Sequence, residues 1–190
     1  GQILVAVDTE EGLAGYGVGG GGAAGVNVVQ TVLRAALLEK DPSDVEGLWT
    51  RMFHQILPFG PEGLAMMALS GVDLALWDLR GKSQGKSVAE LLGGTTGRTI
   101  PVYATVSDLE GVEAALRSGC KAVKINVKNL DPHRSSDRII DLVDRVRDAI
   151  GPEGQVMADA FMAWDVPGTL RIADKIAHYN LMWLEEPLPP

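Results

Sequence analysis

The sequence predicts an α+β segment over residues 1–98, followed by a segment of alternating strands and helices over residues 99–190. Two observations support this division. Before Arg98, two strand-like runs are followed only by stretches with helical spacing, whereas after it strand-like and helical runs alternate strictly. Strict alternation is typical of βα units in a parallel sheet. Because a closed eight-stranded barrel needs about 250 residues, the second segment has room for only the first half of one.

The first segment is predicted to open on an antiparallel hairpin. Strand-like runs at 3–7 and 13–18 flank Asp8–Gly12, which is rich in turn-forming residues. The glycine run Gly19–Gly22 follows, and with Gly17 it spells G-x-G-x-x-G. A dinucleotide-binding loop of this pattern needs a parallel strand after the next helix, but here that helix leads to another helical stretch. We therefore interpret the glycine run as a flexible loop.

Helical patterns account for the rest of the first segment. The predicted helices span 26–38, 45–56, about 62–83 and 87–92. Asp44 precedes the second helix and Pro58–Pro61 ends it, while Gly93 and Gly94 end the fourth. The third helix carries one apolar stripe, made of Leu64, Met67, Ala68, Gly71, Val72, Ala75 and Leu79.

Four strand-like runs alternate with three helical runs in the second segment. The strands are predicted over 100–106, 121–127, 155–159 and 181–184. The helices are predicted over 109–117, 137–150 and 166–179. Asp165 is the expected N-cap of the third helix, with Pro167 in its first turn.

Polar side chains interrupt the second predicted strand of this array. Val123, Ile125 and Val127 share one face, whereas Lys124 and Asn126 share the other. A parallel strand covered by helices is apolar on both faces. The lysine and the asparagine therefore indicate either a solvent-exposed edge or a polar site at the carboxyl end of the sheet.

Acidic residues follow the next two strands. Asp159 ends one apolar run and Glu185 ends the next, about one βα unit further along the chain. An acid after a strand is most often the N-cap of the next helix, but Asp165 already has that role after the third strand. Two carboxylates on neighbouring strand ends suit Mg²⁺, which prefers oxygen ligands. The spacing thus leaves two interpretations open, a helix cap or a magnesium site.

Composition excludes several classes of function. With 17 basic against 25 acidic residues and no basic half, nucleic-acid binding is not expected. No apolar run approaches the roughly 18 residues of a membrane helix. The single cysteine, Cys120, excludes an internal disulfide and fits a reducing cytoplasm. The histidines lack metal-ligand spacing; they are His54, His133 and His178.

The two ends of the chain indicate an internal piece of a longer protein. The sequence starts directly in the strand-like run 3–7, and it stops at Pro190, just after the run 181–184. A parallel strand with no helix after it leaves an open sheet edge. Such an edge is expected to be prone to association.

A long motif carries a resemblance to a known family. Residues 68–82 read Ala-Leu-Ser-Gly-Val-Asp-Leu-Ala-Leu-Trp-Asp-Leu-Arg-Gly-Lys, continued at 87–93 by Ser-Val-Ala-Glu-Leu-Leu-Gly. This stretch resembles the linker-helix signature of the mandelate racemase/muconate lactonizing branch of the enolase superfamily, as does the later order of Lys124, Asp159 and Leu-Glu-Glu-Pro at 184–187. The resemblance implies an α+β capping domain without its first strand, followed by a (β/α) TIM-type barrel truncated after its fourth strand.

The resemblance also implies roles for single residues. Asp159 and Glu185 match two of the family's three Mg²⁺ ligands, and Lys124 matches a catalytic lysine beside the substrate carboxylate. The glycine run around Gly20 and the segment beginning at His54 resemble the two capping-domain loops that close over the substrate. Gly20, His54 and Asn126 are accordingly predicted to bind substrate.

Two departures from the family pattern bear on the reaction. Asn126 stands where the family usually has a second, base-carrying lysine, and Phe161 stands where it often has asparagine. An amide cannot take up a proton at neutral pH, so this face has no base unless Lys128 takes that place. Both features resemble acid-sugar dehydratases, especially those acting on rhamnonate, which use a histidine from later strands.

The resemblance therefore implies a Mg²⁺-dependent lyase that converts a sugar acid to a 2-keto-3-deoxy acid and forms a homo-oligomer at full length. Two alternatives stay open. One is a racemase, epimerase or cycloisomerase of the same superfamily. The other is that residues 1–190 alone are inactive, because they lack the third metal ligand and a His-Asp base.

Overall fold

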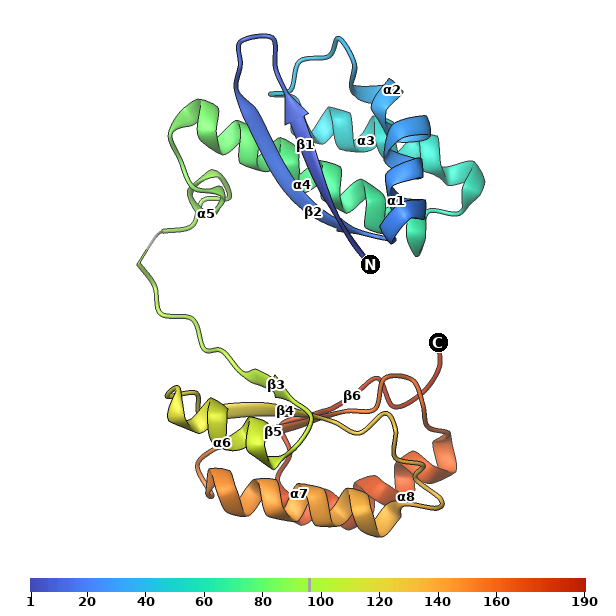
Figure 1. Ribbon diagram of the computed structural model, residues 1–190, viewed down its shortest axis with the longest axis vertical. Helices are drawn as coiled ribbons and strands as arrows, with labels where there is room; N and C mark the ends of the chain where they lie inside the picture. The colour runs from blue at the N-terminus through green and yellow to red at the C-terminus, as the bar shows by residue number, and fades with distance from the viewer. Residues whose placement is uncertain (96) are drawn as a thin grey trace. The chain divides into compact units, whose positions relative to one another are not determined.

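The computed structural model describes residues 1–95 and 97–190. The chain divides into two compact units, the N-terminal unit (residues 1–98) and the C-terminal unit (residues 99–190), drawn in Figure 1. Each unit has its own hydrophobic core, and the two cores share no residue. No helix in the described ranges is long and apolar enough to cross a membrane.

The N-terminal unit is a hairpin packed against helices. Strands β1 (Gln2–Asp8) and β2 (Ala14–Gly20) pair antiparallel, with Val5 opposite Gly17. The helical elements are α1 (Gly22–Val28), η1 (Val29–Leu33), α2 (Arg34–Leu37), α3 (Val45–Ile56), η2 (Leu57–Phe59), α4 (Leu64–Gln84) and α5 (Val88–Leu91). The hairpin and α3 occur as predicted, and the Asp44 carboxylate caps α3 by accepting a hydrogen bond from the Gly47 N–H.

The prediction that the glycine run is a flexible loop is wrong. Gly19 and Gly20 belong to β2, and α1 begins at Gly22, directly after a left-handed turn at Gly21. Every second residue of β2 from Gly15 to Gly19 is a glycine that faces α4. A Cβ atom at Gly17 would lie 2.1 Å from the Gly71 carbonyl oxygen, so only glycine allows this close approach. The motif thus serves helix-to-strand packing, and the helices after β2 exclude the dinucleotide-binding topology.

The buried side of α4 differs in part from the predicted stripe. Ala68, Val72 and Ala75 are fully buried, but Leu64 and Met67 are 41% and 52% exposed. Both lie at the start of the helix, where the facing end of the hairpin is formed by glycines. Glycines have no side chains that could cover Leu64 and Met67, so the first turn of α4 is open to solvent.

The C-terminal unit is a parallel sheet with helices on one face. Within the described residues the sheet has the order β3 (Ala104–Val106), β4 (Ala122–Asn126), β5 (Gln155–Asp159) and β6 (Leu184–Glu185). The connecting helices are α6 (Leu109–Arg117), α7 (Ser136–Ile150) and α8 (Val166–Ile176), which continues as η3 (Ala177–Tyr179). These helices lie together on one side of the strands in Figure 1.

Both outer strands are shorter than predicted. The sequence predicts strands over 100–106 and 181–184, whereas β3 has three residues and β6 has two. An edge strand has one neighbouring strand, so it can pair only over the residues that lie opposite that neighbour. The pairing of β3 with β4 starts at Ala104, which lies opposite Val123. Ile100 and Val102 lie before that point and are 74% and 70% exposed.

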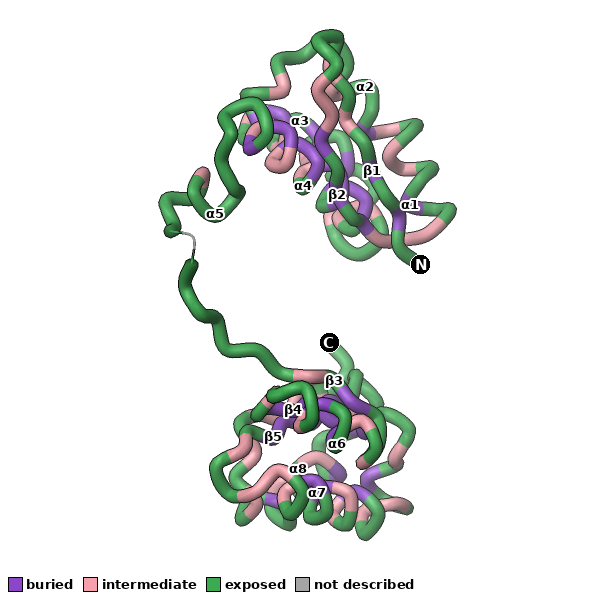
Figure 2. The backbone as a smooth tube through the Cα atoms, turned by 60° about the vertical axis from the view of Figure 1, so that its left-hand side comes forward, coloured by how far each residue is buried: buried purple, intermediate pink, exposed green. Residues whose placement is uncertain are grey.

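The two faces of β4 differ as the alternation predicts. Val123, Ile125 and Val127 are fully buried in the core formed with the helices. Within the C-terminal unit, Figure 2 shows buried segments on β4 and β5. Lys124 lies on the opposite face of β4, and this face carries the polar residues of the candidate site.

Candidate metal site at the strand ends

Three residues of the candidate site lie in one row at the carboxyl end of the sheet. Asn126 on β4 is opposite Asp159 on β5, and Asp159 is opposite Glu185 on β6. Side chains alternate along a strand, so Lys124 lies on the same face, one step below Asn126. Register alone therefore gathers the predicted metal ligands and the predicted catalytic lysine on one face.

Lys124 bridges the two carboxylates. Its Nζ lies 3.0 Å from Asp159 Oδ2 and 2.9 Å from Glu185 Oε1. The side chains of Lys124 and Asp159 are 11% and 10% exposed, and that of Glu185 is 32% exposed. Hydrogen bonds to Glu185 and then to Asp159 raise the pKa of Lys124, outweighing the opposite effect of desolvation. The lysine is therefore charged throughout the physiological range.

The second oxygen of each carboxylate also has a donor. Asp159 Oδ1 accepts a hydrogen bond from the Phe161 N–H at 3.0 Å, across a turn in which Phe161 has a φ of 50°. Glu185 Oε2 accepts a hydrogen bond from Trp183 Nε1 at 3.0 Å. Both carboxylates are thus held in fixed orientations with one oxygen of each turned to Lys124.

The chemistry of these donors fits a magnesium ion. Asp159 and Glu185 offer hard oxygen ligands, and they already converge on a positive charge, the Lys124 ammonium. Among the described residues, no group of three His, Cys, Asp or Glu side chains could hold a metal ion. The part of the chain described here thus offers two ligands for a cation, and any further ligand would have to come from water, substrate or another segment.

Asn126 and Lys128 have local partners in the loop after β4. Asn126 Oδ1 accepts a hydrogen bond from the Lys128 N–H at 3.1 Å, and the Lys128 ammonium lies 5.4 Å from the centroid of the Phe161 ring. The loops after β4 and β5 are therefore joined by a cation–π contact. The substrate-binding role of Asn126 stays a prediction.

Gly20 and His54 belong to the N-terminal unit. Gly20 is the last residue of β2, and the exposed His54 lies in the last turn of α3. Their predicted roles in substrate binding stay predictions.

Sequence reasoning missed two aromatic residues beside the carboxylates. Trp183 donates to Glu185, and the Tyr103 ring lies 5.7 Å from the Trp183 ring in an edge-to-face arrangement. The alternation of Trp183 and Glu185 along the last strand-like run places both on one face and could have identified the tryptophan. No sequence signal indicates the contact with Tyr103, because it depends on the shape of the sheet.

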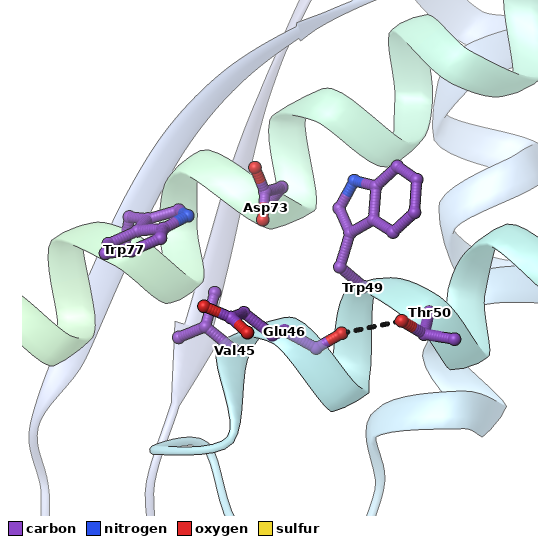
Figure 3. Close-up of a pocket in the computed structure, with 6 residues that line it drawn as sticks. All are labelled: Val45, Glu46, Trp49, Thr50, Asp73 and Trp77. Carbon is purple, nitrogen blue, oxygen red and sulfur yellow. Dashed lines mark hydrogen bonds between the residues drawn. The ribbon is translucent and has the colours of Figure 1, made fainter. Parts of the chain in front are cut away.

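A separate hollow of ≈ 230 Å³ lies between α3 and α4 (Figure 3). Its lining residues are Val45, Glu46, Trp49, Thr50, Asp73 and Trp77. Asp73 lies between the two tryptophans in this view, and burial raises the pKa of its carboxyl group. None of the predicted site residues lines this hollow.

Each of the two units matches a known protein family. Residues 2–93 match the family described as mandelate racemase/muconate lactonizing enzyme, N-terminal domain, and residues 108–190 match the enolase C-terminal domain-like family. Together the two matches leave only short stretches of the chain uncovered. The chain belongs to the mandelate racemase/muconate lactonizing enzyme branch of the enolase superfamily. Its fold is an N-terminal capping domain followed by the start of the enolase barrel, as predicted.

Individual relatives differ in the reaction that their names state. The chain is 34% identical to an L-rhamnonate dehydratase of Saccharopolyspora erythraea, matching over 100% of its own length and 48% of that protein. It is 35% identical to a 3,6-anhydro-alpha-L-galactonate cycloisomerase of Streptomyces coelicolor, over 99% of this chain and 54% of that one. The crystal structure of a racemase from Streptomyces coelicolor with bound magnesium superposes with a TM-score of 0.90 at 33% identity, covering 100% of this chain and 55% of that one. The chain thus spans about half the length of the curated relatives it matches.

Proposed function

We propose that the full-length protein removes the proton α to the carboxylate of a sugar acid in a Mg²⁺-dependent reaction, and that it eliminates the β-hydroxyl group as water. The product is an enol that becomes a 2-keto-3-deoxy acid. The observation that carries this proposal is the convergence of Asp159 and Glu185 on Lys124 at the carboxyl end of the sheet. In barrel folds this end bears the active site.

The roles of the chain's own residues follow from their charges and positions. Asp159 and Glu185 would hold the metal, and Lys124 would place a positive charge beside the substrate carboxylate. Bound Mg²⁺ supplies Lewis-acid stabilisation of negative charge, as is general for enolase-superfamily sites. The Phe161 N–H donates a hydrogen bond to Asp159, and the Trp183 indole N–H donates one to Glu185.

The absence of a base at position 126 favours dehydration. Asn126 cannot accept the α-proton, so a single base on the other face of the substrate would have to remove it. One-sided proton removal followed by loss of a hydroxyl group is a dehydration, whereas racemisation requires proton exchange on both faces. The dehydratase among the similar proteins supports this choice.

A cycloisomerase is the second candidate. A relative named as a cycloisomerase is as similar to this chain as the dehydratase is, at 35% against 34% identity. Such a reaction would use the same carboxylates and lysine but would open or close a ring without releasing water.

The full-length protein, incubated with Mg²⁺ and a panel of sugar acids, is expected to form 2-keto acids, detected as semicarbazones. Asp159→Asn and Glu185→Gln should each lower kcat/KM on the order of 10³-fold, because each removes a charge that holds the cation. Removing Mg²⁺ with a chelator should abolish turnover, and adding Mg²⁺ back should restore it.

Glu186→Gln is the matched control for these substitutions. Glu186 is the exposed neighbour of Glu185 and has a φ of 41°, so the same change there should leave turnover nearly unaltered. Products that are only epimers or ring isomers would contradict the dehydratase assignment. Unchanged activity of both Asp159→Asn and Glu185→Gln would contradict the metal site itself.

A further inference from the structure

An aromatic pair lies directly beneath the candidate metal site. Trp183 precedes β6 and Tyr103 precedes β3, and their rings meet with centroids 5.7 Å apart and planes at 77°. The Lys124 ammonium lies 5.7 Å from the centroid of the Tyr103 ring. The pair therefore contacts the charged cluster through both the tryptophan and the tyrosine.

The two rings meet across the width of the sheet. Strands β3 and β6 are the two opposite edges of the sheet. With neighbouring strands about 4.8 Å apart, the edges of a flat sheet of this order would be separated by about 14 Å. Both side chains therefore reach inward over the face that carries Lys124, across a gap that the curvature expected for part of a barrel wall would shorten.

Trp183 and Lys124 bind different oxygens of the Glu185 carboxylate. The indole N–H can only donate, and it donates to Glu185 Oε2 at 3.0 Å. Glu185 Oε1 faces the Lys124 ammonium at 2.9 Å, on the side where Mg²⁺ would bind. The Tyr103 edge-to-face contact fixes the plane of the indole. Partners of this kind behind a metal ligand typically contribute 10- to 100-fold to metal affinity.

Resting on the proposed function, we propose that Trp183 is a positioning residue for the metal-ligating Glu185, and that Tyr103 holds the indole in place. Trp183 does not touch the cation; it orders the carboxylate that does. The ligand thus needs no reorganisation when Mg²⁺ binds.

The test is Mg²⁺ affinity measured by calorimetry on the full-length protein. Trp183→Phe keeps an aromatic ring against Tyr103 but removes the N–H, and it should raise the Kd for Mg²⁺ roughly tenfold. Turnover of this variant should recover at saturating Mg²⁺, because its defect lies in cation binding. Tyr103→Leu should weaken binding by a smaller factor, whereas Tyr103→Phe, which keeps the ring, should bind as the wild type does.

Trp164→Phe is the matched control. Trp164 lies in the same unit, and its Nε1 donates to the Leu130 carbonyl oxygen at 3.0 Å, away from both carboxylates. The same substitution there also removes an indole hydrogen bond, so it should lower Tm but leave the Mg²⁺ affinity unchanged. If Trp183 were only structural, Trp183→Phe would behave in the same way as Trp164→Phe.

The outcomes separate this inference from the proposed function. Absence of Mg²⁺ binding by the wild-type protein overturns both. Equal Kd values for wild type and Trp183→Phe overturn the positioning role alone. Should Trp183→Phe not fold, the indole N–H resonance of Trp183 in wild-type protein decides: it should shift with the same midpoint as the calorimetric titration, and an unmoved resonance overturns the inference.

Discussion

At the scale of single residues, Lys124 explains how two carboxylates can lie close together. Buried like charges are costly unless an opposite charge compensates them. The Lys124 ammonium lies within 3.0 Å of both Asp159 and Glu185 and provides that compensation. One ammonium compensates only one of the two negative charges, so the cluster keeps a net negative charge that a bound cation would offset while sharing the carboxylates with Lys124.

Asp73 lies in the hollow between α3 and α4 and leads to a prediction on pH. Burial raises its pKa above the ordinary value of 3.8, so the unfolded state ionises first as pH rises. The free energy of unfolding therefore falls as pH increases from 3.8 to the raised pKa. Asp73→Asn should raise the free energy of unfolding at pH 7 by less than about 1 kcal/mol, because solvent screens the half-exposed group, and Tm should rise with it.

Thermal melts across pH check this prediction for Asp73. The gain from Asp73→Asn should shrink as pH is lowered toward 4, where the wild-type carboxyl becomes protonated. Asp174→Asn, a substitution of the same kind on α8, serves as the control because Asp174 is exposed to solvent. A gain that is constant with pH would show that the carboxylate charge is not the cause.

The sequence predicted where Lys124, Asp159 and Glu185 lie in the sheet better than it predicted their contacts, and their roles stay predictions. Alternation placed Lys124 with Asn126 on one face of a strand, and spacing placed Asp159 and Glu185 on neighbouring strand ends. The ion pairs among them depend on side-chain length across three strands. The contact of Tyr103 with Trp183 depends on sheet curvature, which no local pattern encodes.

At the scale of elements, three helices begin with the same device. An aspartate N-cap accepts a hydrogen bond from the N–H of a glycine three residues later, in α3 from Gly47, in α6 from Gly111 and in α8 from Gly168. In α8 a Cβ at Gly168 would lie 2.6 Å from the Pro132 side chain and 2.7 Å from Asp165 Oδ1. The glycine leaves room for the capping carboxylate and for the neighbouring loop.

The glycine face of β2 gives a prediction on packing. Gly17→Ala would place a Cβ 2.1 Å from the Gly71 carbonyl oxygen, so the strand and α4 would have to separate. We expect a loss of about 1–3 kcal/mol in the free energy of unfolding, measured by denaturant titration. Val18→Ala, on the outward face where the side chain is 52% exposed, should cost much less.

An equal effect of the Gly17 and Val18 substitutions would contradict close packing of β2 on α4. Gly71→Ala offers a second test from the helix side, because its Cβ would lie 2.9 Å from Gly19 backbone atoms. It should likewise destabilise the N-terminal unit, even though alanine favours helices.

Some bounds were predicted correctly, among them those of the strand over 155–159, whereas the edge strands and the start of the first helix were not. The helix over 45–56 and the helix over 109–117 match α3 and α6, because an aspartate cap marks the start of each. The edge strands β3 and β6 were overestimated, because apolar runs do not reveal where a neighbour is available for pairing. The glycine run was misread because its role depends on a helix distant in sequence.

At the scale of the whole molecule, two separate cores predict two separate responses to mutation. Leu69 is fully buried in the N-terminal core, so Leu69→Ala should destabilise that unit by about 2–5 kcal/mol. Amide hydrogen exchange should show faster exchange throughout residues 1–98 and little change over 99–190. Leu74→Ala, on the same helix but 51% exposed, should alter neither.

Equal acceleration of exchange in both units would contradict this independence. The prediction rests on the division of the chain at Arg98 and on cores that have no residue in common. Faster amide exchange confined to residues 1–98 would mean that the strands carrying Asp159 and Glu185 keep their pairing when Leu69→Ala destabilises the N-terminal unit.

The pairing of Tyr103 with Trp183 across opposite edges of the sheet has an optical consequence. Because the two rings come from opposite edges of the sheet, the distance between them depends on how far apart these edges lie. Tryptophan emission is sensitive to a neighbouring phenol and to a nearby carboxylate. A change in the distance between β3 and β6 would therefore change the fluorescence of Trp183, without any attached dye.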